Sequence, residues 1–253
     1  MSLTLREIGK SIEHAALKPD VTKADIAREI TLAMDENVRA LVVHPNNFIM
    51  ASSFLSGITD VLPVPVADFP HGRGFLSQRR YGLNSLYMAG AEEVDIVSQY
   101  QYLKDNDFSG FQQDLDGLVN ISISHNGVLK IILEVDELTK EQIETATHII
   151  MEIAALKQDA KLFIKTKTGF AKEVKIDNLD AVKLIAGLLK EHEMDGDRAG
   201  KIRVKASGGV KNLDTLLALK KAGAHTIGTS SLKVIMDEAR AKITSKDKSV
   251  LST

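Results

Sequence analysis

The sequence contains no cysteine and no tryptophan among its 253 residues. Without cysteine the chain can form no disulfide, no thiolate metal site and no cysteine nucleophile. An excess of positive charge is missing too, because 32 Lys and Arg residues stand against 34 Asp and Glu residues, a net charge of -2. No cluster of basic residues stands out locally, so the composition argues against a nucleic-acid partner.

Long apolar runs are also absent. No run reaches the roughly 20 residues that span a bilayer, and charged residues occupy the amino-terminal stretch where a signal peptide would be apolar. We therefore expect a cytoplasmic protein without a membrane partner. With 44% hydrophobic residues and no linker-like stretch, the chain is expected to form one large α/β domain over residues 1–253.

Short β-rich apolar runs alternate with longer segments of helical spacing along the whole chain. The predicted strands are 12–17, 40–44, 61–67, 93–97, 129–135, 162–166, 202–206 and 226–229. The predicted helices include 22–37, 139–155, 176–189, 213–222 and 230–243. Eight β/α units in about 250 residues favour a (β/α)₈ TIM barrel with a short N-terminal helical extension. A doubly wound sheet is the alternative, but no G-x-G-x-x-G follows the first strands.

The run Phe163–Thr166 delivers a lysine to the end of a strand. Side chains alternate along a strand, so Phe163 and Lys165 share one face while Leu162 and Ile164 share the other. If the aliphatic face packs on the helices, Lys165 points into the barrel. Charges inside a barrel are costly unless they pair or take part in chemistry, and barrel active sites lie at the carboxyl-terminal rim.

The same alternation in other strands sends Asp95, Glu134 and Lys205 inward. For Glu134 a structural pairing role is expected. The seven histidines show no metal-ligand spacing, so no metal site is predicted.

Six motifs occur in order along nearly the whole chain. They are IEHAALKP at 12–19, FPHG at 69–72, EVDIV at 93–97, FIKT at 163–166, VKASGGV at 204–210 and IGTSS at 227–231. Together they resemble successive motifs of the deoxyribose-phosphate aldolase family, whereas each alone is weak.

This resemblance implies a TIM barrel that reversibly cleaves 2-deoxyribose 5-phosphate to acetaldehyde and glyceraldehyde 3-phosphate, with no metal and no cofactor. It implies a role in deoxyribonucleotide catabolism and suggests a homodimer. By resemblance, Lys165 forms the Schiff base, Lys205 is the second active-site lysine and Asp95 takes part in proton relay. The residues expected to hold the phosphate side of the substrate are Thr168, Gly169, Gly208, Gly209, Gly228, Ser230 and Ser231.

A reactive lysine needs a lowered pKa, because at the ordinary value near 10.4 only about one amine in 2,500 is neutral at pH 7. Lys205 at about 5 Å would disfavour a charged Lys165 by roughly 3 kcal/mol at an effective dielectric near 20. A carboxylate beside Lys165 would raise the pKa of Lys165 again, so we expect Asp95 to lie against Lys205 or a water. Lys167 is the rival nucleophile, which we expect to be solvated and protonated.

Five positions depart from the family pattern: Glu13, Ala15, Val43, Val135 and Thr226. We expect them to line the pocket, where lost hydroxyl groups would weaken recognition of the substrate's own hydroxyls. The substrate could then be a different phosphorylated sugar or a shorter aldehyde. Two alternatives stay open: a related class I aldolase or transaldolase-like enzyme with another donor, and a non-catalytic barrel that binds sugar phosphates.

Overall fold

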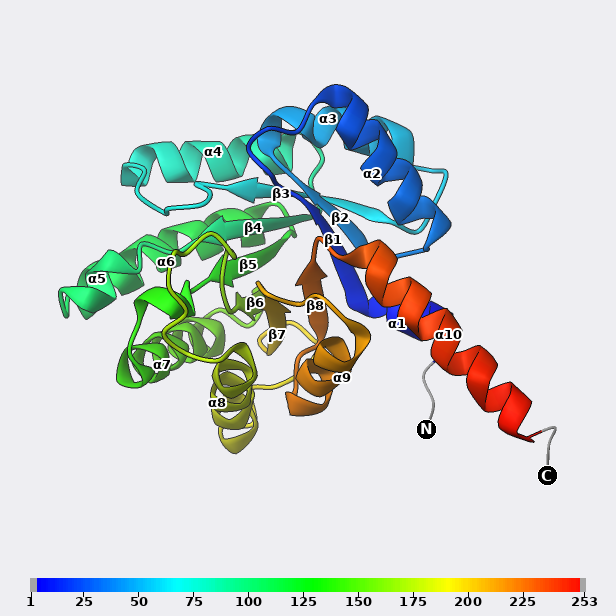
Figure 1. The fold of residues 1–253 in the computed structure, drawn as a ribbon. Coiled ribbons are helices and arrows are strands. Elements are labelled where there is room, and N and C mark those ends of the chain that lie inside the picture. The colour runs from blue at the N-terminus through cyan, green and yellow to red at the C-terminus, as the bar shows by residue number, and fades with distance from the viewer. Residues whose placement is uncertain (1–3, 251–253) are drawn as a thin grey trace.

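The computed structural model describes the backbone of residues 4–250 and the side chains of residues 4–244. Eight parallel strands form a closed barrel in the order β1-β2-β3-β4-β5-β6-β7-β8, and the helices surround it (Figure 1). The strands are β1 (Ile12–Ala16), β2 (Ala40–Val43), β3 (Leu62–Ala67), β4 (Glu93–Val97), β5 (Val128–Ile132), β6 (Lys161–Lys165), β7 (Ile202–Ser207) and β8 (Thr226–Thr229). The predicted TIM barrel is confirmed.

The helices follow the strands in turn. They are α1 (Leu5–Ser11), α2 (Lys23–Asp35), α3 (Pro45–Leu55), α4 (Leu76–Met88), α5 (Gln101–Lys104), α6 (Phe108–Ser124), α7 (Lys140–Leu156), α8 (Asn178–Glu191), α9 (Leu213–Ala222) and α10 (Leu232–Val250). Thr22 and Thr139 cap α2 and α7 with capping boxes, which explains why these helices begin there. The predicted N-terminal extension is α1, which lies beside α10 in Figure 1.

The end of the fifth strand was predicted wrongly. We expected it to continue to residue 135, but β5 ends at Ile132 and a 3₁₀ turn, η1, follows at Val135–Glu137. Between them Glu134 has φ 57° and ψ 62°, a left-handed conformation that no strand can continue. The other strand boundaries agree with the predicted ones to within one residue, which is the usual uncertainty of element ends.

The two faces of the barrel sheet have different chemistry. The outward face is aliphatic, with residues such as Ile131, Ile164 and Val204 fully buried in the main hydrophobic core. On β1 the inward face carries the buried carboxylate of Glu13, and along β2 and β3 it is apolar, where Val42, Val64 and Val66 form a separate buried cluster. Along β4 to β7 it is charged instead. No helix within residues 4–250 is long and apolar enough to cross a membrane.

Candidate active site

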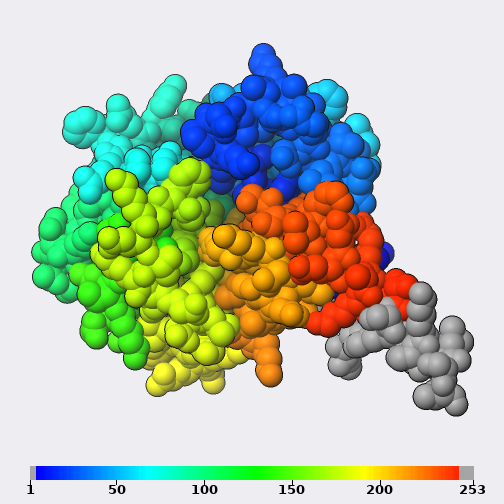
Figure 2. Space-filling model, in the orientation of Figure 1, coloured from blue at the N-terminus to red at the C-terminus, as the bar shows by residue number. Residues whose placement is uncertain are grey.

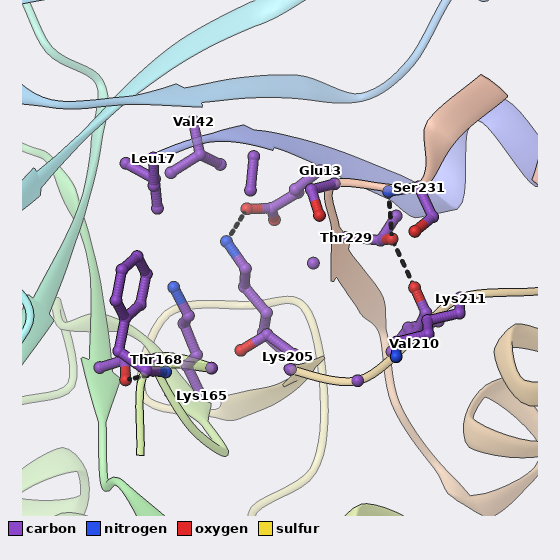
Figure 3. A pocket seen from close by; sticks show the side chains of 18 of the residues that line it. Glu13, Leu17, Val42, Lys165, Thr168, Lys205, Val210, Lys211, Thr229 and Ser231 are labelled. Atoms are coloured by element: carbon purple, nitrogen blue, oxygen red, sulfur yellow. Dashed lines mark hydrogen bonds and ion pairs between the residues drawn. The ribbon is translucent and has the colours of Figure 1, made fainter. Parts of the chain in front are cut away.

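Lys165 closes β6 at the carboxyl-terminal end of the barrel. Its register partner on β7 is Lys205, so the two lysines are neighbours on the inner face. They are only 3% and 1% exposed, and both amines point toward the strand that carries Glu13 (Figure 3). The inward direction predicted for both lysines from strand alternation is confirmed.

Asp95 on β4 joins the two lysines. Its Oδ2 atom accepts a hydrogen bond from Lys165 Nζ at 2.8 Å and another from Lys205 Nζ at 2.7 Å. Asp95 therefore contacts Lys205 as expected, but it also contacts Lys165, which was not expected. Burial by itself would raise the pKa of Asp95, but Lys165, Lys205 and Lys130 hold that pKa well below its usual value.

Below these three residues the charges continue deeper into the barrel. Lys130 lies 3.1 Å from Glu13, 2.6 Å from Glu93 and 3.3 Å from Asp95. Glu13 also accepts hydrogen bonds from Lys205 and from Arg39. Sequence reasoning missed this layer, although the alternation that placed Asp95 and Lys165 inward applies equally to Glu13 and Lys130.

The balance of charge in this cluster singles out Lys165. Four cations lie within ion-pair distance of three carboxylates, and the described contacts of Lys165 include one of these carboxylates, Asp95. Lys130 has three such partners, whereas Lys205 and Arg39 have two each. Since a buried charge needs compensation, Lys165 is the cation that most readily loses its proton.

The pKa of Lys165 agrees with this conclusion. Burial, opposed by Asp95 and assisted by Lys205, lowers the pKa of Lys165 from 10.5 to about 8. At pH 7 about one amine in ten is then neutral. We expected Lys205 to be the main cause of the shift, but the loss of hydration on burial is the larger one.

A cavity of about 270 Å³ opens above the two lysines, a size suited to a small metabolite. Figure 2 shows a hollow in this region, between the blue amino-terminal segments and the yellow-green and orange segments that follow β6 and β7. All seven residues predicted to hold the phosphate side line this cavity: Thr168, Gly169, Gly208, Gly209, Gly228, Ser230 and Ser231. The structure brings them together from the loops after β6 and β7, from β8 itself and from the loop that follows it.

Other residues also line the cavity, among which Ala15 was predicted and Lys18, Lys211, Leu17 and Val42 were not. The exposed cations Lys18 and Lys211 are part of the cavity lining. Ala15, Leu17 and Val42 form an apolar wall. Side-chain alternation along β1 and β2 was the signal for Ala15 and Val42, whereas Leu17 lies just beyond the end of β1.

The five departures from the family pattern were expected to line the pocket, which is correct for only two of them. Glu13 and Ala15 line the cavity, whereas Val43, Val135 and Thr226 are buried outside its described lining. On β2 it is Val42 that faces the cavity, because successive strand residues point to opposite faces.

Two further expectations concern residues near Lys165. Lys167 is not solvated as predicted: it is 4% exposed, and both carboxylate oxygens of Asp136 accept from its Nζ at 2.9 Å. Glu134 lies beyond the end of β5 and outside the described lining of the main cavity. There it has the expected pairing role, because its Oε2 accepts from the backbone N–H and the hydroxyl of Thr168.

Within residues 4–244 no group of three or more histidine or acidic side chains is arranged to hold a metal ion.

Comparison with known proteins gives consistent matches over most of the chain, although no family model matches it. The chain is 35% identical to the deoxyribose-phosphate aldolase of Staphylococcus epidermidis over 223 residues, which are 88% of this chain and 92% of that protein. The solved structure named QR15, an aldolase, shares 30% identity with a TM-score of 0.80, covering 94% of this chain and 98% of that one. The deoxyribose phosphate aldolase of Aeropyrum pernix, described as a unique tetramer, shares the fold at 23% identity and a TM-score of 0.79, covering 94% and 92% of the two chains.

Proposed function

Because the chain belongs to the deoxyribose-phosphate aldolase family, we propose that it is a class I aldolase that reversibly cleaves 2-deoxyribose 5-phosphate to acetaldehyde and glyceraldehyde 3-phosphate. The observation that carries this proposal is the buried amine of Lys165, which combines a pKa near 8 with a position at the floor of the cavity. A neutral amine at this place is the nucleophile that a Schiff-base mechanism requires.

In the first step the neutral Lys165 amine attacks the C1 aldehyde of the open-chain sugar, and loss of water leaves an iminium ion. The C3 hydroxyl then gives up its proton, and the C2–C3 electron pair moves toward the iminium nitrogen. This cleavage releases glyceraldehyde 3-phosphate and leaves an enamine on Lys165. Protonation at the enamine carbon and hydrolysis release acetaldehyde and restore the amine.

Each of these steps moves a proton beside Lys165, and Lys205 and Asp95 are in place to assist. Lys205 is held between Asp95 and Glu13, so its amine is positioned to donate a proton to the hydroxyl that leaves when the iminium forms. Asp95, which contacts both amines through one oxygen, can pass protons between them and a water. We assign these two residues to proton transfer.

The phosphate group fits the opposite side of the cavity. Gly208 and Gly209 follow β7, and Ser230 and Ser231 precede α10, so backbone amides and hydroxyls converge there. In TIM barrels this region after the last two strands frequently binds phosphate. The exposed amines of Lys18 and Lys211 add positive charge at the rim.

The apolar wall bears on the choice of donor. Ala15, Leu17 and Val42 offer no side-chain hydrogen-bonding group beside the lysines, so a hydroxylated donor would leave its hydroxyl unpaired on this side. This favours acetaldehyde over dihydroxyacetone as the donor in the synthetic direction. A cytoplasmic location and a homodimer, both suggested by family membership, complete the proposal.

The proposal is tested by a retro-aldol assay on 2-deoxyribose 5-phosphate with the wild type and Lys165→Ala. Borohydride reduction in the presence of substrate should add mass to the peptide that contains Lys165. A matched control is Lys161→Ala on the same strand, because Lys161 bonds to Asn126 at the opposite end of the barrel.

The expected result is activity in the wild type and the control, with a loss of at least about 10³-fold in Lys165→Ala. Binding of the sugar phosphate without turnover or trapping would indicate a non-catalytic barrel. Turnover with dihydroxyacetone in place of acetaldehyde would indicate a related aldolase with another donor.

A further inference from the structure

A buried ion pair lies behind Gly208, a residue that lines the cavity, and takes no part in the reaction as proposed. We propose that this pair, Lys167 with Asp136, positions two glycine segments of the cavity for binding of the substrate phosphate. The glycine segments are residues 168–169, after β6, and residues 208–209, after β7. The inference rests on the proposed function, because that function gives the cavity a phosphorylated substrate. Lys167 and Asp136 are therefore positioning residues, and neither lines the cavity in its described extent.

The ion pair is held tightly. Lys167 Nζ donates to Oδ1 and Oδ2 of Asp136 at 2.9 Å each, and the two residues are 4% and 3% exposed. Asp136 belongs to η1, the turn that follows β5. The contact therefore ties the segment after β6 to the segment after β5.

The methylene chain of Lys167 supports Gly208 directly. A Cβ atom built on Gly208 would lie 2.9 Å from both Cγ and Cδ of Lys167, closer than real Cβ contacts. Gly208 also has φ +84°, a conformation that side chains other than glycine rarely adopt. The Lys167 chain and the Gly208 backbone thus fit closely, with no space for a side chain between them.

The same contact extends to the second glycine segment. A Cβ on Gly169 would lie 3.4 Å from the Cα atom of Gly208, so the two glycines pack against each other. Ser207 donates its hydroxyl to the carbonyl of Lys167 at 2.5 Å. Both glycines line the cavity, and a displacement of Lys167 would move both of them.

Two other roles for Lys167 fit the contacts less well. To act as a nucleophile, the Lys167 amine would have to break its hydrogen bonds to both carboxylate oxygens of Asp136. As a direct phosphate ligand it would have to reach past Gly208, which its chain lies against. A buried ion pair contributes little net stability but holds its partners in one geometry when fully paired. Orientation of the glycine segments is the role that remains.

The test compares phosphorylated and non-phosphorylated substrates. In Lys167→Met the chain length under Gly208 is kept but the ion pair is lost. Because this leaves Asp136 buried without a partner, the double variant Lys167→Met/Asp136→Leu is measured beside it. The matched control is Lys104→Met, which removes an exposed ion pair to Glu137 on the same turn, η1.

Both Lys167 variants should raise KM for 2-deoxyribose 5-phosphate about tenfold, the effect of one misplaced hydrogen bond to a charged group. KM for unphosphorylated 2-deoxyribose and kcat for both sugars should change by less than about threefold. Binding of inorganic phosphate, measured by calorimetry without any turnover, should weaken by the same factor of about ten. The control should match the wild type.

Unchanged phosphate binding in both Lys167 variants would overturn the inference, as would an equal loss of activity on both sugars. Loss of borohydride trapping in Lys167→Met would make Lys167 the nucleophile and overturn it as well. A wild type that binds inorganic phosphate but does not cleave 2-deoxyribose 5-phosphate would defeat the proposed function. The calorimetric comparison would still decide the inference in that case.

Discussion

Lys165 and Lys205 donate hydrogen bonds to the same atom, Oδ2 of Asp95, at 2.8 and 2.7 Å. The shared acceptor keeps the two amines close, so the Lys205 amine disfavours a positive charge on Lys165. Asp95 opposes this effect on Lys165. Lys165 therefore holds its proton less tightly than an ordinary lysine, and about one amine in ten is neutral at pH 7.

Lys205→Met should make Lys165 less reactive at neutral pH. Removing the neighbouring amine takes away one cause of the lowered pKa and leaves Asp95 more fully available to stabilise a charged Lys165. We expect the pKa of Lys165 to rise by about one unit or more. The rate of reductive trapping by acetaldehyde and cyanoborohydride should then fall about tenfold at pH 7, and its pH profile should move from about 8 to higher pH. An unshifted profile would mean that burial alone sets this pKa.

Lys165→Met should be more stable than the wild type at pH 7. The folded-state pKa of Lys165 is lowered from 10.5 to about 8, so below pH 8 the folded chain carries a charge that it disfavours. Between these values the unfolded chain binds more protons, and raising the pH stabilises the folded wild type. The free energy of unfolding of the variant, which lacks the amine, should exceed that of the wild type by about 3 kcal/mol at pH 7.

That difference should shrink as the pH rises from 8 toward 10.5. Urea denaturation of both proteins at pH 7 and at pH 9.5 measures it, and contributions from other groups cancel in the comparison. A difference that does not depend on pH would show that the lowered pKa is not the cause.

The alternation of strands and helices along the chain was enough to predict the barrel, and the alternation of side chains within strands predicted the inward positions of Lys165, Asp95 and Lys205. It succeeded because these strands are aliphatic on the outer face and charged on the inner one, and a slip by one residue would bury the wrong set. The cavity-lining glycines and serines followed from the motifs, since their loops all end at the same rim.

Other features depend on contacts that a pattern does not contain. The partner of Lys167 is Asp136 of the turn η1, which begins at the last residue of the predicted fifth strand. The lowered pKa of Lys165 depends on the degree of burial, and burial is a property of the packed barrel. Val43 lies outside the cavity because side chains alternate along β2. Val135 lies outside it because the turn at Glu134 ends the strand before this residue.

Glu134→Leu should weaken substrate binding through Thr168. Oε2 of Glu134 accepts from both the N–H and the hydroxyl of Thr168, and leucine provides no acceptor for either. We expect KM for the sugar phosphate to rise about tenfold, as for a lost hydrogen bond to a charged group. In Glu134→Gln the amide oxygen can still accept, so KM should stay within about threefold. Equal effects of the two substitutions would contradict this role.

The ionisation of Glu134 can be tested by comparing the stability of Glu134→Gln with that of the wild type at two pH values. Burial raises the pKa of Glu134, so the folded wild type should lose stability as the pH rises through this raised value. Glu134→Gln has no proton to lose at this position. Its stability relative to the wild type should therefore be higher at pH 8 than at pH 5, as measured by chemical denaturation at both values.

Ser230→Asp should weaken binding of the phosphorylated substrate and leave binding of the unphosphorylated sugar unchanged. Ser230 is exposed at the cavity rim in the loop before α10, and a carboxylate there would face the substrate phosphate. Across about 5 Å, at an effective dielectric near 40, two like charges repel by about 2 kcal/mol. This corresponds to a rise in KM of about thirtyfold for 2-deoxyribose 5-phosphate.

The matched control for this substitution is Ser230→Asn, which has nearly the same size as aspartate but no charge. It should raise KM for the sugar phosphate by less than about threefold. Neither variant should change KM for unphosphorylated 2-deoxyribose, because that sugar places no charge near residue 230. Steady-state kinetics on both sugars at two salt concentrations provide the measurement, since added salt screens the repulsion and should reduce the effect of aspartate alone. If Asp and Asn at this position gave the same KM, the phosphate would have to bind elsewhere in the cavity.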